Sequence, residues 1–432
     1  MTSFTRRHAL GAGGALGLAA ALAACGSDTG GGDGGTPELT DEGKDLTVWF
    51  MKDSVSEKAM DWLKSAYEEK TGGTLTYEIQ VWEGIVSKLQ TSLASTSSTP
   101  DIIELGNTQA PTFCAVGALL NLDDLKEDLG GDSLTQSLVE LGSFDGSLYA
   151  APFYAGSRVF FYRKDWFEEL GLEVPTTIEQ LTSVATTLHE ANPGGNADFS
   201  GLWLPGIGAQ QCYAWLFTNG GRIATEKDGK WAADLSSEES QAAFAQVQEI
   251  WSKASRAGSV TDPTTGGELH VPFNAEEAGM IFGFNWQYKS IDEKLQDKVG
   301  FFGFPGVEEG GTGHPFAGGS NIAISASSQK QTAAVEALKL IFAKEFQELF
   351  ATEGGWVPGN IDHASALGDD DLATLTAQAV ENSVGTPAAA NWALVEGART
   401  LDDFFVALAG GGDPVSLATT ADASITDMLN KS

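Results

Sequence analysis

Residues 46–105, LTVWFMKDSVSEKAMDWLKSAYEEKTGGTLTYEIQVWEGIVSKLQTSLASTSSTPDIIEL, alternate three apolar runs with two longer amphipathic segments. The runs at 46–50, 75–82 and 100–105 are rich in β-branched and aromatic residues and predict strands. Residues 54–70 and 85–94 repeat apolar side chains at the spacing of a helix face. This β-α-β-α-β order predicts an α/β fold with a mostly parallel sheet flanked by helices.

Polar and aromatic side chains stand just past each of these strands. Ligands in such sheets bind at the carboxyl ends of the strands, which meet at one edge. We therefore expect the following side chains to lie together at that edge: Asp53 after the first strand, Trp82 and Glu83 after the second, and Asn107, Thr108 and Gln109 after the third.

The first 24 residues have the composition of an export signal. Arg6-Arg7 form a basic head, and the apolar run 9–24 is shorter than the roughly 20 residues that span a membrane. The segment Leu22-Ala23-Ala24-Cys25 resembles the lipobox of bacterial lipoproteins, which implies cleavage before Cys25 and a lipid on its sulfur. The alternative is an ordinary signal peptide with a chance cysteine. The paired arginines fit either the Sec or the twin-arginine export route.

Residues 25–45 are rich in glycine and acidic side chains and predict a flexible tether. The whole chain has 432 residues, which exceeds what one hydrophobic core usually organises, so we expect two lobes. Its formal net charge of −34 repels phosphate backbones and disfavours nucleic acid and other polyanions as partners. No Cys/His cluster has the spacing of a metal site, so no metal or cofactor is expected.

The middle of the chain carries three motifs in a fixed order. Residues 145–152 (DGSLYAAP) lead into 159–167 (VFFYRKDWF), and 175–181 (PTTIEQL) follow a glycine. They resemble the "G-x-x-Y-x-x-P", "Y-N-K-D-x-F" and "P-x-T-W-x-E-L" motifs of family 1 extracellular solute-binding proteins, the maltose-binding protein group. Arg163 replaces the usual Asn and Ile178 the usual Trp.

Further segments of the chain match this family in the same order, so that the resemblance spans about residues 46–425. Residues 274–280 resemble a helix that precedes the "G-x-W" element, here 283–286 (GFNW). The later matches are 300–306 (GFFGFPG), 316–320 (FAGGS) and 354–358 (GGWVP).

The resemblance implies the two-lobe periplasmic-binding-protein (Venus flytrap) fold, in which the chain crosses several times between the lobes. Each lobe would hold a mixed, mostly parallel sheet flanked by helices. The first lobe would comprise 45–155 and about 300–345, and the second 156–299 and about 346–432. Cys114 and Cys212 would then fall in different lobes, where a disulfide would lock the hinge, so we expect both to be unpaired.

A sugar in the cleft needs flat apolar surfaces for its C–H faces and polar partners for its hydroxyls. One of the candidates below, Arg158, could instead form a salt bridge at the hinge. The candidate ligand-binding residues are Asp53, Trp82, Glu83, Asn107, Thr108, Gln109, Gly318, Gly319 and Ser320 in the first lobe, Tyr154 and Arg158 at the hinge, and Gln211, Tyr213, Trp215, Asn285, Trp286, Trp356 and Trp392 beyond it.

The family resemblance implies a monomeric lipoprotein at the outer face of the cell membrane, without enzymatic activity. It would capture an oligosaccharide for the permease of an ABC importer. Residues 101–109 resemble members that bind chitobiose or related β-linked disaccharides, while maltodextrins, cellobiose-like glycans, trehalose and polyols stay open. The alternatives are a secreted glycoside hydrolase, which would need two carboxylates across a cleft, and a sugar-sensing binding lipoprotein.

Overall fold

A computed structural model describes residues 38–95, 99–262 and 268–431 of the chain. Nine strands form one continuous sheet in the order β2-β1-β3-β12-β6-β10-β7, with β11 and β13 also paired to β6. Their bounds are β1 Leu46–Met51, β2 Leu75–Gln80, β3 Ile102–Gly106, β6 Ala151–Arg163, β7 Ser200–Trp203, β10 Ala278–Phe284, β11 Val299–Phe302, β12 Ala317–Ile324 and β13 Val357–Pro358. Two hairpins stand apart, β4 Ser143–Phe144 with β5 Ser147–Leu148 and β8 Ala224–Lys227 with β9 Lys230–Ala233.

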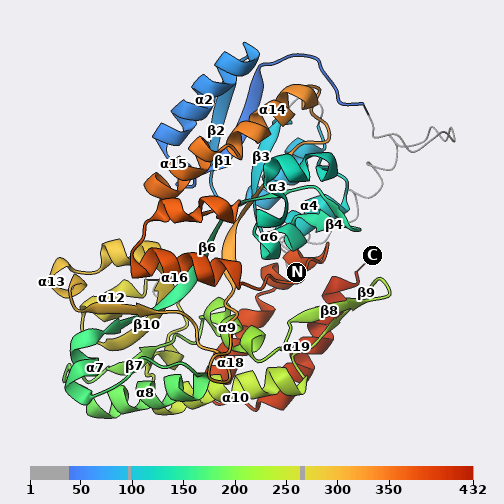
Figure 1. Cartoon of the computed structure of the whole chain (residues 1–432). Coiled ribbons are helices and arrows are strands. Elements are labelled where there is room, and N and C mark those ends of the chain that lie inside the picture. Colours follow the sequence, from blue (N-terminus) through green and yellow to red (C-terminus); the bar gives the residue numbers. More distant parts are fainter. Residues whose placement is uncertain (1–37, 96–98, 263–267, 432) are drawn as a thin grey trace, which may run out of the picture.

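The long strand β6 belongs to both lobes, which Figure 1 shows one above the other with β6 between them. Its first half, up to Ser157, pairs antiparallel with β12. From Arg158 onward it pairs antiparallel with β10 and β11. The chain therefore crosses between the lobes where β6 changes partners.

The first lobe surrounds the sheet β2-β1-β3-β12-β6. As the sequence predicts, β1 runs parallel to both β2 and β3. The first of its helices starts at Ser56, whose hydroxyl accepts a hydrogen bond from Ala59 N at 3.2 Å, a typical N-cap. Apolar side chains cover both faces of the sheet in two separate cores, one around Phe50 and the other around Leu105. Its helices are α2 Glu57–Thr71, α3 Ile85–Leu93, α4 Ala110–Ala115, α5 Lys126–Leu129, α6 Gln136–Leu141, α14 Gln331–Ile341 and α15 Lys344–Gly354.

The second lobe is built on the second half of β6 with β7, β10 and β11. Phe160 of β6 stacks between Phe282 and Phe302 at centroid distances of 4.6 and 4.7 Å, which joins three strands on one face. Its helices are α7 Lys164–Leu170, α8 Ile178–Ala191, α9 Ala209–Thr218, α10 Glu238–Lys253, α12 His270–Asn274, α13 Glu293–Gln296, α16 Asp371–Glu381, α17 Trp392–Gly397, α18 Thr400–Ala409 and α19 Pro414–Leu429. Short 3₁₀ helices lie at η1 Asp123–Leu125, η2 Gly131–Ser133, η3 Ala257–Ser259, η4 Asn285–Ser290 and η5 Ile361–Leu367.

Three expected boundaries differ from the structure. Residues 278–280, expected in a helix, open the strand β10, because their apolar side chains are buried against β6 and β7. The β11 strand starts at Val299 and pairs with the second half of β6, so the chain returns to the first lobe only after residue 302. Helix α15, expected in the second lobe, packs Phe346 and Phe350 into the first-lobe core around Phe50.

The start of the described chain is bound to the first lobe. Thr40 Oγ1 donates to Ser328 O at 2.8 Å, and Glu42 N donates to Gln329 O at 2.8 Å. Residues 40–45, which the sequence places in the tether, are therefore fixed to the loop before α14. The expected signal peptide, Cys25 and the tether up to residue 37 lie outside the described residues.

Candidate functional site

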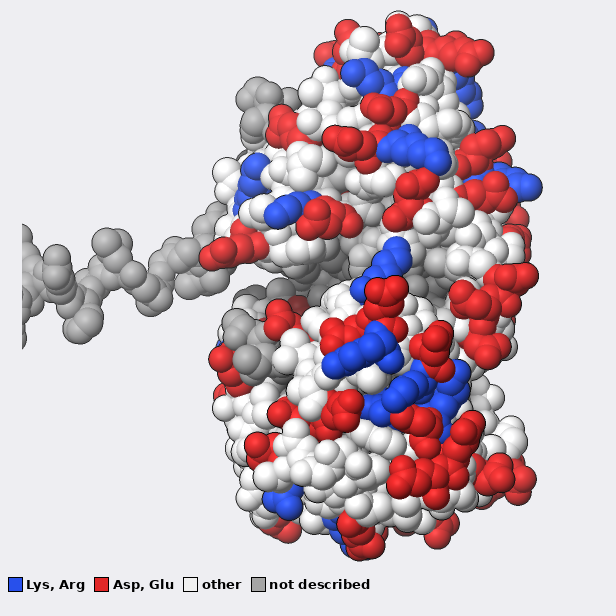
Figure 2. Space-filling view, turned by 90° about the vertical axis from the view of Figure 1, so that its left-hand side faces the viewer, with Lys and Arg blue, Asp and Glu red and all other residues white. Residues whose placement is uncertain are grey.

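A furrow separates the two lobes on the face shown in Figure 2, where acidic side chains are spread over both. The segments that follow β2 and β3 approach each other. A Cβ placed on Gly106 would lie 3.3 Å from both the Trp82 ring and the Gln109 side chain. Trp82 is 43% exposed, and Gln109 Oε1 is buried without a hydrogen-bond partner. The first lobe thus offers a free indole face beside an unused acceptor.

The segment Gly318-Gly319-Ser320 of β12 lies beside the end of β3. Asn107 N donates to Gly319 O, and Asn107 Nδ2 donates to Ala317 O, both at 3.1 Å. The Asn107 amide nitrogen is therefore used to hold the start of β12. A Cβ on Gly319 would lie 2.1 Å from Tyr154 O, so only glycine allows this approach of β12 to β6.

A buried carboxylate fixes the strand ends from below. Glu104 accepts hydrogen bonds from Met51 N (2.8 Å), Ser54 Oγ (2.7 Å) and Ser320 Oγ (2.8 Å). Burial raises the pKa of Glu104, and these donors act against that shift. Glu104 therefore ties β1, β3 and β12 together beneath the loops that face the second lobe. Ser320 serves this network with its hydroxyl.

Aromatic rings and one arginine surround the crossing point of β6. The Arg158 guanidinium lies 4.3 Å above the Phe284 ring, which stacks on Trp286 at 6.0 Å between centroids. Trp356 packs on Tyr154 at 4.8 Å. Tyr154 is itself buried, whereas Trp286 is 42% exposed. Trp286 therefore offers an aromatic face at the hinge.

A side-chain hydrogen bond connects two of the hinge segments. Asn285 Nδ2 donates to Gly355 O at 2.8 Å and so connects η4 to the loop between α15 and β13. A Cβ on Gly156 would lie 3.1 Å from the Trp356 ring and 3.7 Å from the Phe284 ring. Trp356 and Phe284 therefore approach β6 at the same residue.

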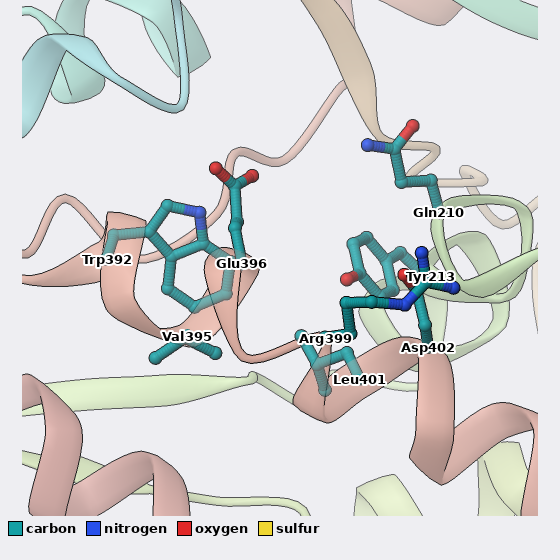
Figure 3. Close-up of a pocket in the computed structure, with 8 residues that line it drawn as sticks. All are labelled: Gln210, Tyr213, Trp392, Val395, Glu396, Arg399, Leu401 and Asp402. Atoms are coloured by element: carbon teal, nitrogen blue, oxygen red, sulfur yellow. Dashed lines mark ion pairs between the residues drawn. The ribbon is translucent and has the colours of Figure 1, made fainter. Parts of the chain in front are cut away.

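Beyond the hinge, the second lobe contains a cavity of about 180 Å³ between α9, α17 and α18 (Figure 3). Figure 3 shows the Trp392 ring and the Glu396 carboxylate at one end and Tyr213 at the other. Its lining residues are Gln210, Tyr213, Trp392, Val395, Glu396, Arg399, Leu401 and Asp402. The cavity combines two aromatic rings with several hydrogen-bonding groups, as ligand pockets commonly do.

Burial sets the electrostatics of this cavity. It raises the pKa of Glu396, with the Asp402 charge acting in the same direction and hydrogen bonding by Thr108 and Trp392 against it. Burial also raises the pKa of Asp402, while the positive charge of Arg399, 3.5 Å away, acts to lower it. Tyr213 has a pKa far above its usual value, first because of burial and then because of the Glu396 and Asp402 charges. At neutral pH Tyr213 therefore keeps its proton and can donate a hydrogen bond.

The two lobes touch each other at α17. Thr108 Oγ1 of the first lobe donates to Glu396 Oε2 of the second at 3.2 Å. Thr112 Oγ1 on α4 donates to Ala390 O at 2.8 Å. These bonds place Thr108, expected at the site, directly against the cavity.

The structure separates Trp215 from this group and leaves Asp53 and Glu83 at the surface. Trp215 is fully buried and packs edge-on against Phe304 in the core of the second lobe, so it does not face the boundary between the lobes. Asp53 and Glu83 are exposed, and Asp53 occupies a turn with a φ of 65°. Gln211 is buried with Oε1 lacking a partner.

Sequence reasoning missed most of the polar lining of the cavity. The residues it did not nominate are Gln210, Val395, Glu396, Arg399, Leu401 and Asp402. Helical spacing could have found one of them, because Glu396 follows Trp392 by four residues and lies on the same face. The others depend on how α18 packs on α9, which no local pattern encodes.

The described helices include none that is both long and apolar enough to cross a membrane. A sequence model of the bacterial extracellular solute-binding proteins matches residues 62–379. The chain is 29% identical over 431 residues to the diacetylchitobiose-binding protein DasA of Streptomyces coelicolor, covering 98% of this chain and 99% of that protein. It is 25% identical over 342 residues to the lactose-binding protein of Rhizobium radiobacter, covering 72% and 74%.

Among solved structures, the sugar-binding protein MalE from Xanthomonas citri matches with a TM-score of 0.79 at 19% identity. The match covers 89% of this chain and 97% of that one. It confirms the expected two-lobe periplasmic-binding-protein fold.

Proposed function

Because the chain belongs to the bacterial extracellular solute-binding proteins, we propose that it binds an oligosaccharide between its lobes and delivers it to the permease of an ABC importer. One observation carries this proposal: both lobes bring aromatic faces and polar atoms without partners to their common boundary. Trp82 and Trp286 supply exposed rings from opposite sides of the hinge. Such rings suit the C–H faces of a pyranose, and the unused polar atoms suit its hydroxyls.

The unused polar atoms form the second part of the support. Buried polar atoms normally have hydrogen-bond partners, and those without one call for an explanation. Three of the atoms that lack partners belong to expected site residues: Gln109 Oε1, Arg158 Nη1 and Gln211 Oε1. A sugar with many hydroxyls would supply them with partners.

The proposed ligand is diacetylchitobiose or another β-linked disaccharide. The similarity to DasA over nearly the whole chain supports this choice, together with the segment 101–109. We assign the ligand contacts to Trp82, Gln109, Arg158, Trp286 and the cavity at Tyr213 and Trp392.

In the proposed mechanism, ligand contacts from both lobes favour a closed arrangement, and a permease recognises that arrangement. Binding itself consumes no ATP. The free energy for closure comes from contacts that form only when both lobes reach the ligand. A lipid on Cys25 would hold the protein at the outer face of the membrane, within reach of the permease. Mass spectrometry of the N-terminal peptide, with the lipid mass absent after Cys25→Ser, tests the anchor.

A glycoside hydrolase is the alternative function, because Glu396 and Asp402 are carboxyl groups with raised pKa values in one cavity. Both come from the second lobe, on α17 and near the start of α18, rather than from opposite sides of a cleft. The named relatives are binding proteins, which favours the transport role. A sugar-sensing lipoprotein would share the same site and differ in its partner.

Calorimetry against a sugar panel tests the proposal, with diacetylchitobiose, cellobiose, lactose, maltose, trehalose and mannitol as ligands. We expect saturable one-to-one binding of a disaccharide and an unchanged sugar on chromatography afterwards. Released monosaccharide would favour the hydrolase. A failure of every sugar to bind would overturn the proposed function.

A further inference from the structure

Strand β6 carries two arginines whose surroundings differ in one respect. Arg163 is 2% exposed, lies 3.7 Å over the Trp166 ring, and donates to both Asp165 oxygens at 2.8 and 2.7 Å. Arg158 is 9% exposed and lies over the Phe284 ring. Among the described residues, however, no carboxylate forms an ion pair with Arg158. Its Nη1, like that of Arg163, has no hydrogen-bond partner.

A buried charge without a partner is costly, and proteins normally provide one, as this chain does for Arg163. The ring beneath Arg158 interacts with the face of the guanidinium and leaves its N–H groups free to donate. Burial lowers the pKa of Arg158 to about 10, so the group is still charged at neutral pH. Its position at the change of partners in β6 places it at the hinge. The hinge salt bridge considered from the sequence is therefore absent from the described structure, and the missing acceptor can come from a ligand.

The surrounding groups restrict the kind of acceptor. Tyr213 and Cys212 on α9 lie near Arg158, and both are neutral at pH 7 because burial raises their pKa values. The charges of Glu396 and Asp402 act in turn on Tyr213, which lines the same cavity. An anionic ligand group would be repelled by these two carboxyls when they are ionised, so a neutral acceptor fits better.

One further group without a partner points to the same chemistry. Gln211 lies next to Cys212 in α9. Its Oε1 is a buried acceptor without a donor. Arg158 thus lacks an acceptor, and Gln211 lacks a donor. A secondary amide supplies both, through its carbonyl oxygen and its N–H.

We propose that Arg158 donates to the carbonyl oxygen of an acetamido group on the ligand, which makes N-acetylated sugars the preferred class. This inference rests on the proposed sugar-binding function. It makes Arg158 a specificity-determining residue, and it predicts discrimination between disaccharides of equal size and linkage. Diacetylchitobiose would bind more tightly than cellobiose, which has a hydroxyl at the acetamido position, and than the deacetylated glucosamine dimer.

The test is calorimetry of the mature protein with these three disaccharides. A charged hydrogen bond of this kind is expected to give a preference of roughly 10- to 100-fold for diacetylchitobiose. Arg158→Gln and Arg158→Lys should weaken diacetylchitobiose binding by about the same factor and change cellobiose binding by less than about threefold. Arg163→Lys is the matched control: it should lower the melting temperature and leave the preference unchanged.

The outcomes are distinct. If the wild-type protein binds cellobiose or another unacetylated sugar as tightly as diacetylchitobiose, the inference fails and the sugar-binding function stands. If the Arg158 variants fold but lose affinity for both sugars equally, Arg158 has only a structural role and the inference fails. If no sugar binds the wild type, the proposed function fails as well. Should the variants not fold, equal affinities of the wild type for the three sugars would still overturn the inference.

Discussion

At the scale of single residues, Glu396 shows how burial and the contact between lobes act on one group. Its carboxylate lines the cavity of the second lobe and accepts a hydrogen bond from Thr108 of the first. Burial raises its pKa, so the ionised form is disfavoured in the folded protein. An acid with a raised pKa binds its proton more tightly when folded. Its contribution to stability therefore falls as pH rises from the unfolded pKa through the folded one.

We predict that Glu396→Gln raises the melting temperature at pH 7, because glutamine keeps an oxygen for Thr108 without the buried charge. The gain should shrink as the pH falls through the raised pKa of Glu396, because the wild-type carboxylate then takes up its proton. Thermal melts of both proteins at several pH values provide the measurement. Glu226→Gln, on the exposed β8–β9 hairpin, is the control and should show no such trend. An equal effect at both positions would contradict the prediction.

The exposed tryptophans at the boundary give a second prediction. Trp82→Ala and Trp286→Ala should each weaken sugar binding by about 3- to 10-fold, because each removes a stacking surface. Stability should change little, since both rings are more than 40% exposed. Phe144→Ala, at an equally exposed aromatic on the β4–β5 hairpin, should leave the affinity unchanged. Calorimetry with the best-bound sugar measures all three.

Residues at strand ends could be predicted from the sequence. Most of the other residues of the candidate site could not. The proximity of Trp82 and Gln109 was predictable because parallel strands bring their carboxyl ends together. Trp215 shows the limit, since its aromatic character suits a core as well as a sugar, and the structure buries it against Phe304. Asp402 could not have been found, because its place in the cavity depends on the packing of one helix on another.

At the scale of elements, β6 is the segment on which both lobes depend. Its partner changes from β12 to β10 within one residue, between Ser157 and Arg158, and β11 pairs with it from Phe160 onward. Ser157 Oγ donates to Phe316 O at 3.0 Å and so fixes this point to the segment before β12. Rigid packing on either side then confines any hinge motion to the neighbouring connections.

Phe160→Ala should destabilise the protein by about 3–5 kcal/mol, because it leaves a cavity between Phe282 and Phe302. Chemical denaturation followed by circular dichroism measures the loss. The exposed Val415→Ala on α19 is the control and should cost much less. A loss below about 1 kcal/mol for Phe160→Ala would show that the core closes around the gap.

Elements with strong local signals were predictable, and those set by tertiary contacts were not. The strands and helices of residues 46–105 lie within a few residues of their expected bounds, because each has a clear period and a stop signal. The β10 strand was mistaken for a helix continuation at 278–280. A buried apolar run has no polar face to reveal its period, so its neighbours decide its conformation.

At the scale of the whole molecule, the proposed ligand should act on both lobes at once. A ligand at about 100 times its dissociation constant should add about 2.7 kcal/mol to the free energy of unfolding. It should also reduce the radius of gyration in small-angle X-ray scattering if the lobes close further around it. Stabilisation without a change in scattering would indicate that the lobes are already as close as the ligand requires.

Cys114 and Cys212 allow a test of whether the two lobes are joined by a disulfide. Cys114 and Cys212 are free, buried thiols in the cores of different lobes. Burial raises the pKa of Cys114 to about 12 and that of Cys212 further. In a Cys25→Ser protein, a thiol reagent at pH 8 should react slowly in the native state and with two groups after unfolding. No reactive thiol in the unfolded protein would reveal a disulfide.

The place of β12 between β3 and β6 has a consequence for the chain during its synthesis. The partner edge of β3 is complete only when residues 317–324 arrive, about 210 residues after β3 ends. At roughly 5–20 residues per second, the ribosome needs about 10–40 s to make that segment. For this time an apolar strand has an open edge, which is a site for wrong pairing. The sheet of the first lobe therefore cannot be completed until residues 317–324 have been made.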